Sequence, residues 1–253
     1  MAMALSAAST PARCVPRPMH RPRPSRRYPP LKASPLKSQN FGERRDGLRP
    51  ELVVIHYTAM KDCAAAAKAL CDPLRQVSAH YLIGRDGEVF NLVPEAMRAW
   101  HAGAGEWRGR GDVNSRSIGI ELDNDGLSPF SEPLLTALET LLGSRLLADW
   151  GIGPEGVIGH SDMAPGRKID PGRRFDWQRL ARQGLAVWSE ATGKAVDAAR
   201  FRTDALAFGY PDVEADLLLE IVRMRFRPWA HGPLDGDDCA VMADLAARYG
   251  YGS

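Results

Sequence analysis

The sequence predicts an α/β fold, in which a mixed central sheet is flanked by helices and followed by a small C-terminal helical domain. Three observations lead to this fold class. Short β-branched runs alternate with helical patterns over roughly residues 45–182. The pair Asp86-Gly87 separates two strand-like runs, which is a strong hairpin signal. Residues 204–250 have helical periodicity.

Apolar patterns place the strands. Residues 52–55 (LVVI) read as a buried strand that leads into His56. Residues 79–90 contain the hairpin. Residues 117–122 (SIGIEL) alternate, so three aliphatic side chains share one face and Glu121 lies on the other. Residues 157–158 form a short strand that ends at His160.

The helices are predicted from composition and from leucine spacing. Residues 62–70 are rich in alanine, and residues 134–149 repeat leucine at helical spacing, as a core-facing helix does. Further helices are expected in 204–228 and in 237–249, the latter with aspartates near its start. We therefore expect a catalytic-type domain over 41–182 and a helical domain over 183–253.

Residues 1–40 are expected to be a disordered, basic, proline-rich tail. Eight prolines occur by residue 35, and residues 1–42 carry a charge of +8. Such a composition buries too little apolar surface to offset chain entropy. The alternative is an arm that binds nucleic acid or an anionic surface. The order of basic and apolar residues differs from that of a secretory signal.

The remaining chain has a net charge of −6, because the whole chain carries +2. We therefore expect no nucleic-acid partner for the folded part. No run of about 18 apolar residues occurs, so we expect no transmembrane segment. Four widely spaced cysteines without a CxxC pair favour a reducing compartment.

Two predicted strands end in a histidine, His56 and His160, at a sheet rim where ligands approach. With Asp170, they supply three protein ligands and leave a fourth tetrahedral position open, as in catalytic zinc sites. Glu121 lies on the polar face of its strand and is a candidate base. Lys168 is a candidate cation for a developing oxyanion.

The stretch GHSDMAPGRKIDPG (159–172) links His160 to Asp170. Its three glycines and two prolines are incompatible with a long regular helix or strand. We expect these residues to set the turns that let both side chains reach one metal ion. Asp162 is expected to brace the loop rather than to bind the metal, since it follows His160 too closely.

Four ordered blocks, IHYTAM, VSAHYLIGRDGEVFNLVPEAMRAWHAG, NSRSIGIELDNDG and GHSDMAPGRKIDPG, resemble the type 2 N-acetylmuramoyl-L-alanine amidases, the zinc amidases of the AmpD and AmiD kind. The resemblance covers roughly residues 39–180. It implies zinc ligands at His56, His160 and Asp170, with Glu121 and Lys168 catalytic. Phage-lysozyme members carry a tyrosine where this chain has Ala79, so the resemblance is to members that use the strand glutamate.

The resemblance also places Trp100-His101-Ala102-Gly103 beside the cleft, where Trp100 and His101 could form the wall or contact substrate. Asn114 is expected to brace the loop before the Glu121 strand and is a further candidate for substrate contact. His80 is expected to pack or to support the site. Residues 183–251 resemble a small peptidoglycan-binding domain, with a helical pair packed on the amidase as the alternative.

The activity implied is zinc-dependent hydrolysis of the bond between N-acetylmuramic acid and L-alanine, in peptidoglycan or anhydro-muropeptides. A catalytically inactive peptidoglycan-binding module is the alternative, and a zinc peptidase is disfavoured because the H-E-x-x-H signature is absent. We expect a monomer in the cytoplasm. The cell envelope is the alternative compartment.

Overall fold

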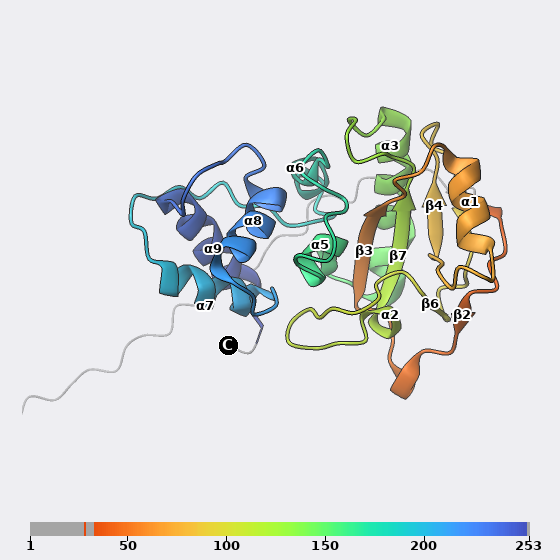
Figure 1. The fold of residues 1–253 in the computed structure, drawn as a ribbon, viewed down its shortest axis with the longest axis horizontal. Helices are drawn as coiled ribbons and strands as arrows, with labels where there is room; N and C mark the ends of the chain where they lie inside the picture. Colours follow the sequence, from red (N-terminus) through yellow and green to blue (C-terminus); the bar gives the residue numbers. More distant parts are fainter. Residues whose placement is uncertain (1–27, 29–32, 252–253) are drawn as a thin grey trace, which may run out of the picture.

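The computed structural model describes Tyr28 and residues 33–251, and its N-terminal part is built on a six-stranded mixed sheet (Figure 1). The strand order is β1-β5-β4-β7-β3-β8. Only β4 and β5, the predicted hairpin, pair antiparallel within this sheet. Its strands are β1 (Ala33–Pro35), β3 (Leu52–Tyr57), β4 (Tyr81–Ile83), β5 (Val89–Asn91), β7 (Ser117–Leu122) and β8 (Val157–Gly159). The predicted fold class is confirmed.

The helices follow the predicted segments closely, and a small second sheet pairs β2 (Phe41–Gly42) with β6 (Arg98–Ala99). The helix predicted over 134–149 runs as α3, a π-helical turn over Leu142–Leu146, and α4. Within the described part, no helix is both long and apolar enough to cross a membrane. The α-helices are α1 (Cys63–Cys71), α2 (Val113–Arg116), α3 (Glu132–Leu141), α4 (Leu147–Trp150), α5 (His160–Met163), α6 (Trp177–Arg182), α7 (Ala198–Phe208), α8 (Ala215–Phe226) and α9 (Gly236–Tyr249).

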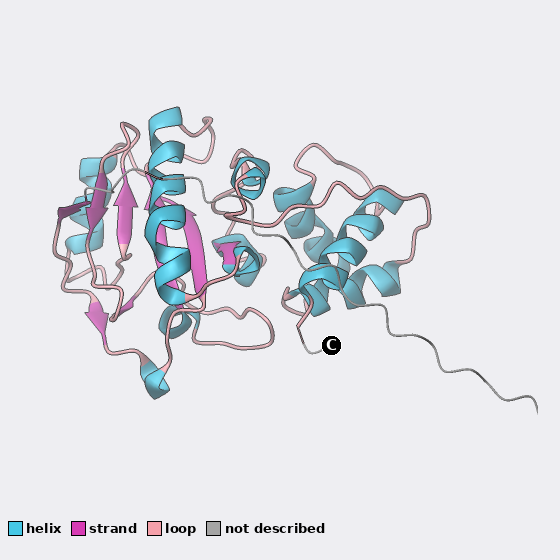
Figure 2. Cartoon of the chain, turned by 180° about the vertical axis from the view of Figure 1, so that it is seen from behind, coloured by secondary structure: helices cyan, strands magenta, loops and turns pink. Residues whose placement is uncertain are grey.

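The two faces of the sheet have different roles. Helix α3 covers one face (Figure 2), where Leu134 and Leu138 pack in one cluster with Ile118 and Ile120 of β7. Alternation along the strand then turns Glu121 to the opposite face. On that face, α1 packs against one side of the sheet, and the C-terminal helices lie at the other side. The functional side chains therefore lie on the face that α3 leaves free.

The C-terminal helices share a hydrophobic cluster with the sheet. Leu52 of β3 and Ile158 of β8 belong to the same buried cluster as Phe208 and Met242 from α7 and α9. A buried ion pair joins Arg225 of α8 to Asp162 of α5, with 2.6 Å between Nη1 and Oδ2. The boundary predicted at residue 182 coincides with the end of α6, but the hydrophobic core continues across it.

The prediction of a disordered tail over residues 1–40 is wrong for residues 33–40, and its remainder apart from Tyr28 lies outside the described residues. Strand β1 pairs in parallel with β5, and Pro35 is tolerated because β1 is an edge strand. Ser38 and Asn40 are buried, and the Asn40 amide donates to the carbonyls of Asp72 and Val77. These long-range bonds leave no signature in local composition.

Candidate active site

The site forms where three neighbouring parallel strands end. His56 of β3 lies directly opposite Glu121 of β7 in the sheet register, so both side chains emerge on one face. Strand β8 pairs with the other edge of β3, and the chain enters α5 at His160 immediately after it. Because the carboxyl ends of parallel strands meet at one edge, residues 104 positions apart in the chain become neighbours.

The loop after His160 has the constrained shape that its composition predicts, with one difference. His160–Met163 form a single helical turn, stabilised by the Asp162 carboxylate, which accepts from the main-chain nitrogen of Gly159. The chain then returns so that Ser161 N donates to the carbonyl of Asp170 at 2.9 Å. Gly166 adopts a positive φ of 71°, a conformation that favours glycine. The loop thus brings Asp170 beside His160.

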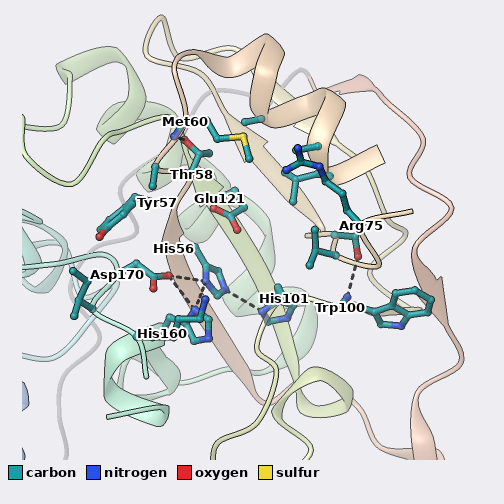
Figure 3. Close-up of a pocket in the computed structure, with 18 of the residues that line it drawn as sticks. His56, Tyr57, Thr58, Met60, Arg75, Trp100, His101, Glu121, His160 and Asp170 are labelled. Atoms are coloured by element: carbon teal, nitrogen blue, oxygen red, sulfur yellow. Dashed lines mark hydrogen bonds and ion pairs between the residues drawn. The ribbon is translucent and has the colours of Figure 1, made fainter. Parts of the chain in front are cut away.

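Three potential metal ligands converge at this point (Figure 3). His56 Nδ1 lies 3.0 Å from His160 Nδ1 and 2.9 Å from Asp170 Oδ2, and His160 Nδ1 lies 3.1 Å from Asp170 Oδ2. Two imidazoles and one carboxylate with an open side are a donor set that suits catalytic zinc. The residues present therefore fit the metal that the resemblance implies.

The Glu121 carboxyl faces the same pocket. Its Oε2 is buried and has no hydrogen-bond partner among the described residues, which suits an atom that serves a bound water or substrate. Burial, reinforced by the negative charge of Asp170, raises the pKa of Glu121 to about 8. Lys168 lines the pocket and is close enough for its charge to lower the pKa of both Glu121 and His56.

The charge state of the ligands is consistent with metal binding. Burial, with the neighbouring His160, lowers the pKa of His56 to about 4, so its imidazole is neutral at pH 7. Burial would raise the pKa of Asp170, but the close contacts of its carboxylate with the His160 and His56 rings hold this pKa below its usual range. Neutral imidazoles and an ionised carboxylate are the forms that bind a divalent cation.

These residues open into a cavity of about 550 Å³ that runs from the ligands towards α1. Trp100 and His101 line it, as expected for cleft residues. Asn114 instead lies beneath the loop: its side chain is buried, and its Oδ1 accepts from the main-chain nitrogens of His101 and Ala102. The structure supports Asn114 as a brace and does not place it at the pocket surface.

Sequence reasoning missed two groups near the ligands. Arg167 lines the pocket, and its guanidinium donates to the carbonyls of Ala102 and Ala104. Ser117 hydrogen-bonds His101 at 3.1 Å. Arg167 stands beside Lys168 in a run of charged residues, and Ser117 is the first residue of a strand, so no local pattern marks either residue.

His80 supports the strands rather than the ligands. Its Nδ1 accepts from Gly119 N at 2.9 Å, and its Nε2 lies 3.1 Å from the carbonyl of Met97. Because Nδ1 accepts a hydrogen bond, the ring must be neutral, and burial lowers the pKa of His80 to about 3. Its role is to join the β4 region to β7 beneath the site.

This pKa predicts that His80 destabilises the fold in acid. In the unfolded chain His80 is protonated below about pH 6.5, whereas in the folded chain it is protonated only below about pH 3. The free energy of unfolding therefore falls as the pH decreases from about 6.5 to about 3. At pH 5 the loss from this group is on the order of 2 kcal/mol relative to pH 7. Urea unfolding of wild type and of His80→Gln at both pH values measures this loss of stability. The variant should lose less stability on acidification than wild type does. Equal losses would contradict the role assigned to His80.

Comparison with known proteins agrees with this geometry. Residues 46–173 match the family model described as N-acetylmuramoyl-L-alanine amidase. The chain is 36% identical to the amidase AmiD of Escherichia coli K12, over 80% of this chain and 84% of AmiD. It is 45% identical to AmpD of Enterobacter cloacae, over 41% of this chain and 55% of AmpD.

A solved structure extends the likeness to most of the chain. The structure of E. coli AmiD with anhydro-N-acetylmuramic acid-L-Ala-D-gamma-Glu-L-Lys superposes with a TM-score of 0.71 and 33% identity, covering 84% of this chain and 99% of AmiD. AmpDh3 of Pseudomonas aeruginosa gives a TM-score of 0.73 at 32% identity, covering 81% of this chain and 94% of AmpDh3. On its sequence, its fold and the converging side chains of its pocket, this chain belongs to the N-acetylmuramoyl-L-alanine amidase family.

Proposed function

We propose that this protein hydrolyses the amide bond between N-acetylmuramic acid and L-alanine, in peptidoglycan or in anhydro-muropeptides, with a zinc ion held by His56, His160 and Asp170. The observation that carries the proposal is the convergence of these three side chains beside the unpartnered Glu121 oxygen. The anhydro-muropeptide in the AmiD complex supports the substrate class.

A zinc ion at this site would polarise the scissile carbonyl and acidify water. Glu121 would accept the proton of the attacking water and pass it to the leaving amine nitrogen. Its buried Oε2, which has no hydrogen-bond partner among the described residues, is available for this proton. Lys168 would place its positive charge beside the oxygen that becomes negative in the tetrahedral transition state.

A catalytically inactive peptidoglycan-binding module is the alternative. Such a module needs the pocket but needs neither the ligands nor the base. All five side chains assigned to chemistry, namely His56, His160, Asp170, Glu121 and Lys168, lie at or line the same cavity. That arrangement favours the enzyme.

The test is an assay of the purified full chain on a muropeptide. We expect about one zinc per chain and the release of a peptide with a new amino terminus on L-alanine. A chelator should abolish the release, and added zinc should restore it. Cleavage that continues without zinc, or no cleavage by zinc-loaded protein, would refute the proposal.

We further propose that residues 183–253 contribute to peptidoglycan binding and that the protein acts as a monomer. For the compartment we propose the cytoplasm, since the described cysteines are free thiols: Cys63, Cys71 and Cys239. A peptidoglycan-binding role of residues 183–253 would instead place the protein in the cell envelope. Fractionation of cells that express the chain with its native N-terminus distinguishes the two, and sedimentation reports the oligomeric state.

A further inference from the structure

The loop Trp100–Ala102 lies behind the two candidate metal histidines and contacts the outer nitrogen of each. His56 Nε2 is 3.0 Å from His101 Nδ1 (Figure 3), and His160 Nε2 is 2.8 Å from the carbonyl of Ala102. The ring nitrogens that face the metal position are Nδ1 in both histidines. The role assigned to this loop rests on the proposed zinc site.

The proton on His160 can be placed from its outer contact. A main-chain carbonyl only accepts hydrogen bonds, so the 2.8 Å contact to Ala102 requires a hydrogen on Nε2 of His160. A neutral imidazole carries one hydrogen, which leaves the lone pair on Nδ1, directed at the metal position. The Ala102 carbonyl therefore selects the tautomer that can bind zinc.

The proton on His56 is placed by a longer chain of hydrogen bonds. Ser117 Oγ lies 2.5 Å from the carbonyl of Val113 and must donate its single hydrogen there. It can then only accept from His101 Nε2, at 3.1 Å. A neutral His101 with its hydrogen on Nε2 offers Nδ1 as an acceptor, so His56 must donate from Nε2. His56 Nδ1 thereby keeps its lone pair.

This outer chain opposes a competing arrangement. Asp170 Oδ2 lies 2.9 Å from His56 Nδ1 and would attract a hydrogen to that nitrogen. A hydrogen on Nδ1 would block His56 as a ligand. The Ser117–His101 chain stabilises the other tautomer by giving Nε2–H a fixed acceptor.

The fold holds the loop in the required place by two further devices. Asn114 Oδ1 accepts from the main-chain nitrogens of both His101 (3.0 Å) and Ala102 (2.8 Å). Gly119 of β7 makes room for the His101 ring, since a Cβ at this position would lie 2.4 Å from His101 Cγ. This close approach accounts for a glycine in the middle of a buried strand, where it costs stability.

We propose that the His101–Ala102 segment sets the tautomers of both zinc histidines, and that Ser117, through His101, is the positioning residue for His56. Outer-shell partners of metal histidines typically change metal affinity about 10–100-fold when removed. Ser117 and His101 thus act on the metal through His56, whereas the Ala102 carbonyl acts on His160. The two branches are separable by mutation.

The test is Ser117→Ala, read by long-range ¹H–¹⁵N correlation spectra of the histidine rings in zinc-free full-length protein. In wild type we expect hydrogen on Nε2 of both His56 and His160. In the variant His56 should shift towards the Nδ1–H tautomer while His160 stays unchanged, and zinc affinity should fall about 10–100-fold. His101→Leu, which removes the acceptor itself, should cause the same change at His56.

The matched control is Ser38→Ala. Ser38 is likewise buried, donates to a main-chain carbonyl and accepts one hydrogen bond, but it contacts no histidine. It should leave both tautomers and zinc affinity as in wild type. An Nδ1–H tautomer of His56 in wild type, or unchanged spectra and zinc affinity in Ser117→Ala and His101→Leu, would overturn the proposal. The expected tautomers in a protein that does not bind zinc would support the hydrogen-bond scheme and refute the zinc site alone.

Discussion

Replacing Glu121 by glutamine is expected to lower kcat on a muropeptide by about 10²–10⁴. The glutamine side chain has nearly the same shape but cannot accept a proton from the attacking water. Glu121 is not one of the three converging ligands, so the zinc content should stay near one per chain. Steady-state kinetics together with metal analysis separates the loss of a base from the loss of the metal.

The matched control for this substitution is Glu88→Gln. Glu88 directly precedes β5 in the β4–β5 hairpin, and its carboxylate accepts from Ser34 at 3.1 Å in an exposed contact outside the cavity lining. Its variant should retain the wild-type kcat. A wild-type kcat for Glu121→Gln would remove Glu121 from the role of base, and loss of zinc from this variant would reassign it to metal binding.

Replacing Arg225 by methionine is expected to reduce the free energy of unfolding by about 3–5 kcal/mol, the usual cost of leaving one member of a buried ion pair alone. Arg225 and Asp162 have side chains only 2% and 1% exposed. The guanidinium also donates to the carbonyl of Val157 at 3.0 Å and lies 4.3 Å from the centre of the Trp177 ring. Urea unfolding of the zinc-loaded chain measures the loss.

Two further variants show whether the buried charge is the cause. Adding Asp162→Asn to Arg225→Met should recover part of the stability, because the uncompensated carboxylate is then neutral. Arg202→Met removes an exposed ion pair with Asp212 and should cost no more than about 1 kcal/mol. A loss for Arg225→Met as small as that for Arg202→Met would mean that α8 does not depend on this pair for its attachment to α5.

The Arg225 pair also gives the C-terminal helices a role in the site. The Asp162 carboxylate accepts hydrogen bonds from Gly159 N, the Tyr210 hydroxyl and the Arg225 guanidinium. Asp162 lies in the same helical turn as His160. Sequence reasoning identified Asp162 only as a brace and could not name its partners Tyr210 and Arg225, which come 48 and 63 residues later in the chain. The C-terminal helices therefore pack against the helical turn that carries His160, a candidate metal ligand.

Local sequence patterns were sufficient to predict several features of the fold and of the candidate site. Strand alternation placed Glu121 on the face opposite the aliphatic residues, and the Asp86-Gly87 pair predicted the β4–β5 hairpin; both are seen in the structure. The ligand set followed from His56 and His160 at strand ends and from Asp170 in the Pro/Gly loop, and the structure brings the three together. These properties depend on neighbours in the chain and on the alternation of a strand, which a sequence displays directly.

Tertiary structure alone decided the rest. Several features of the fold depend on contacts between residues that no sequence periodicity relates. These are the pairing of β1 with β5, the brace formed by Asn114, the hydrogen bond of Ser117 to His101 and the buried Arg225–Asp162 pair. A hydrogen bond or an ion pair is fixed by distances of about 3 Å, and only the folded chain determines which distant groups come that close. The sequence by itself thus determined the fold class and the candidate ligands, and the packing decided how those ligands are held.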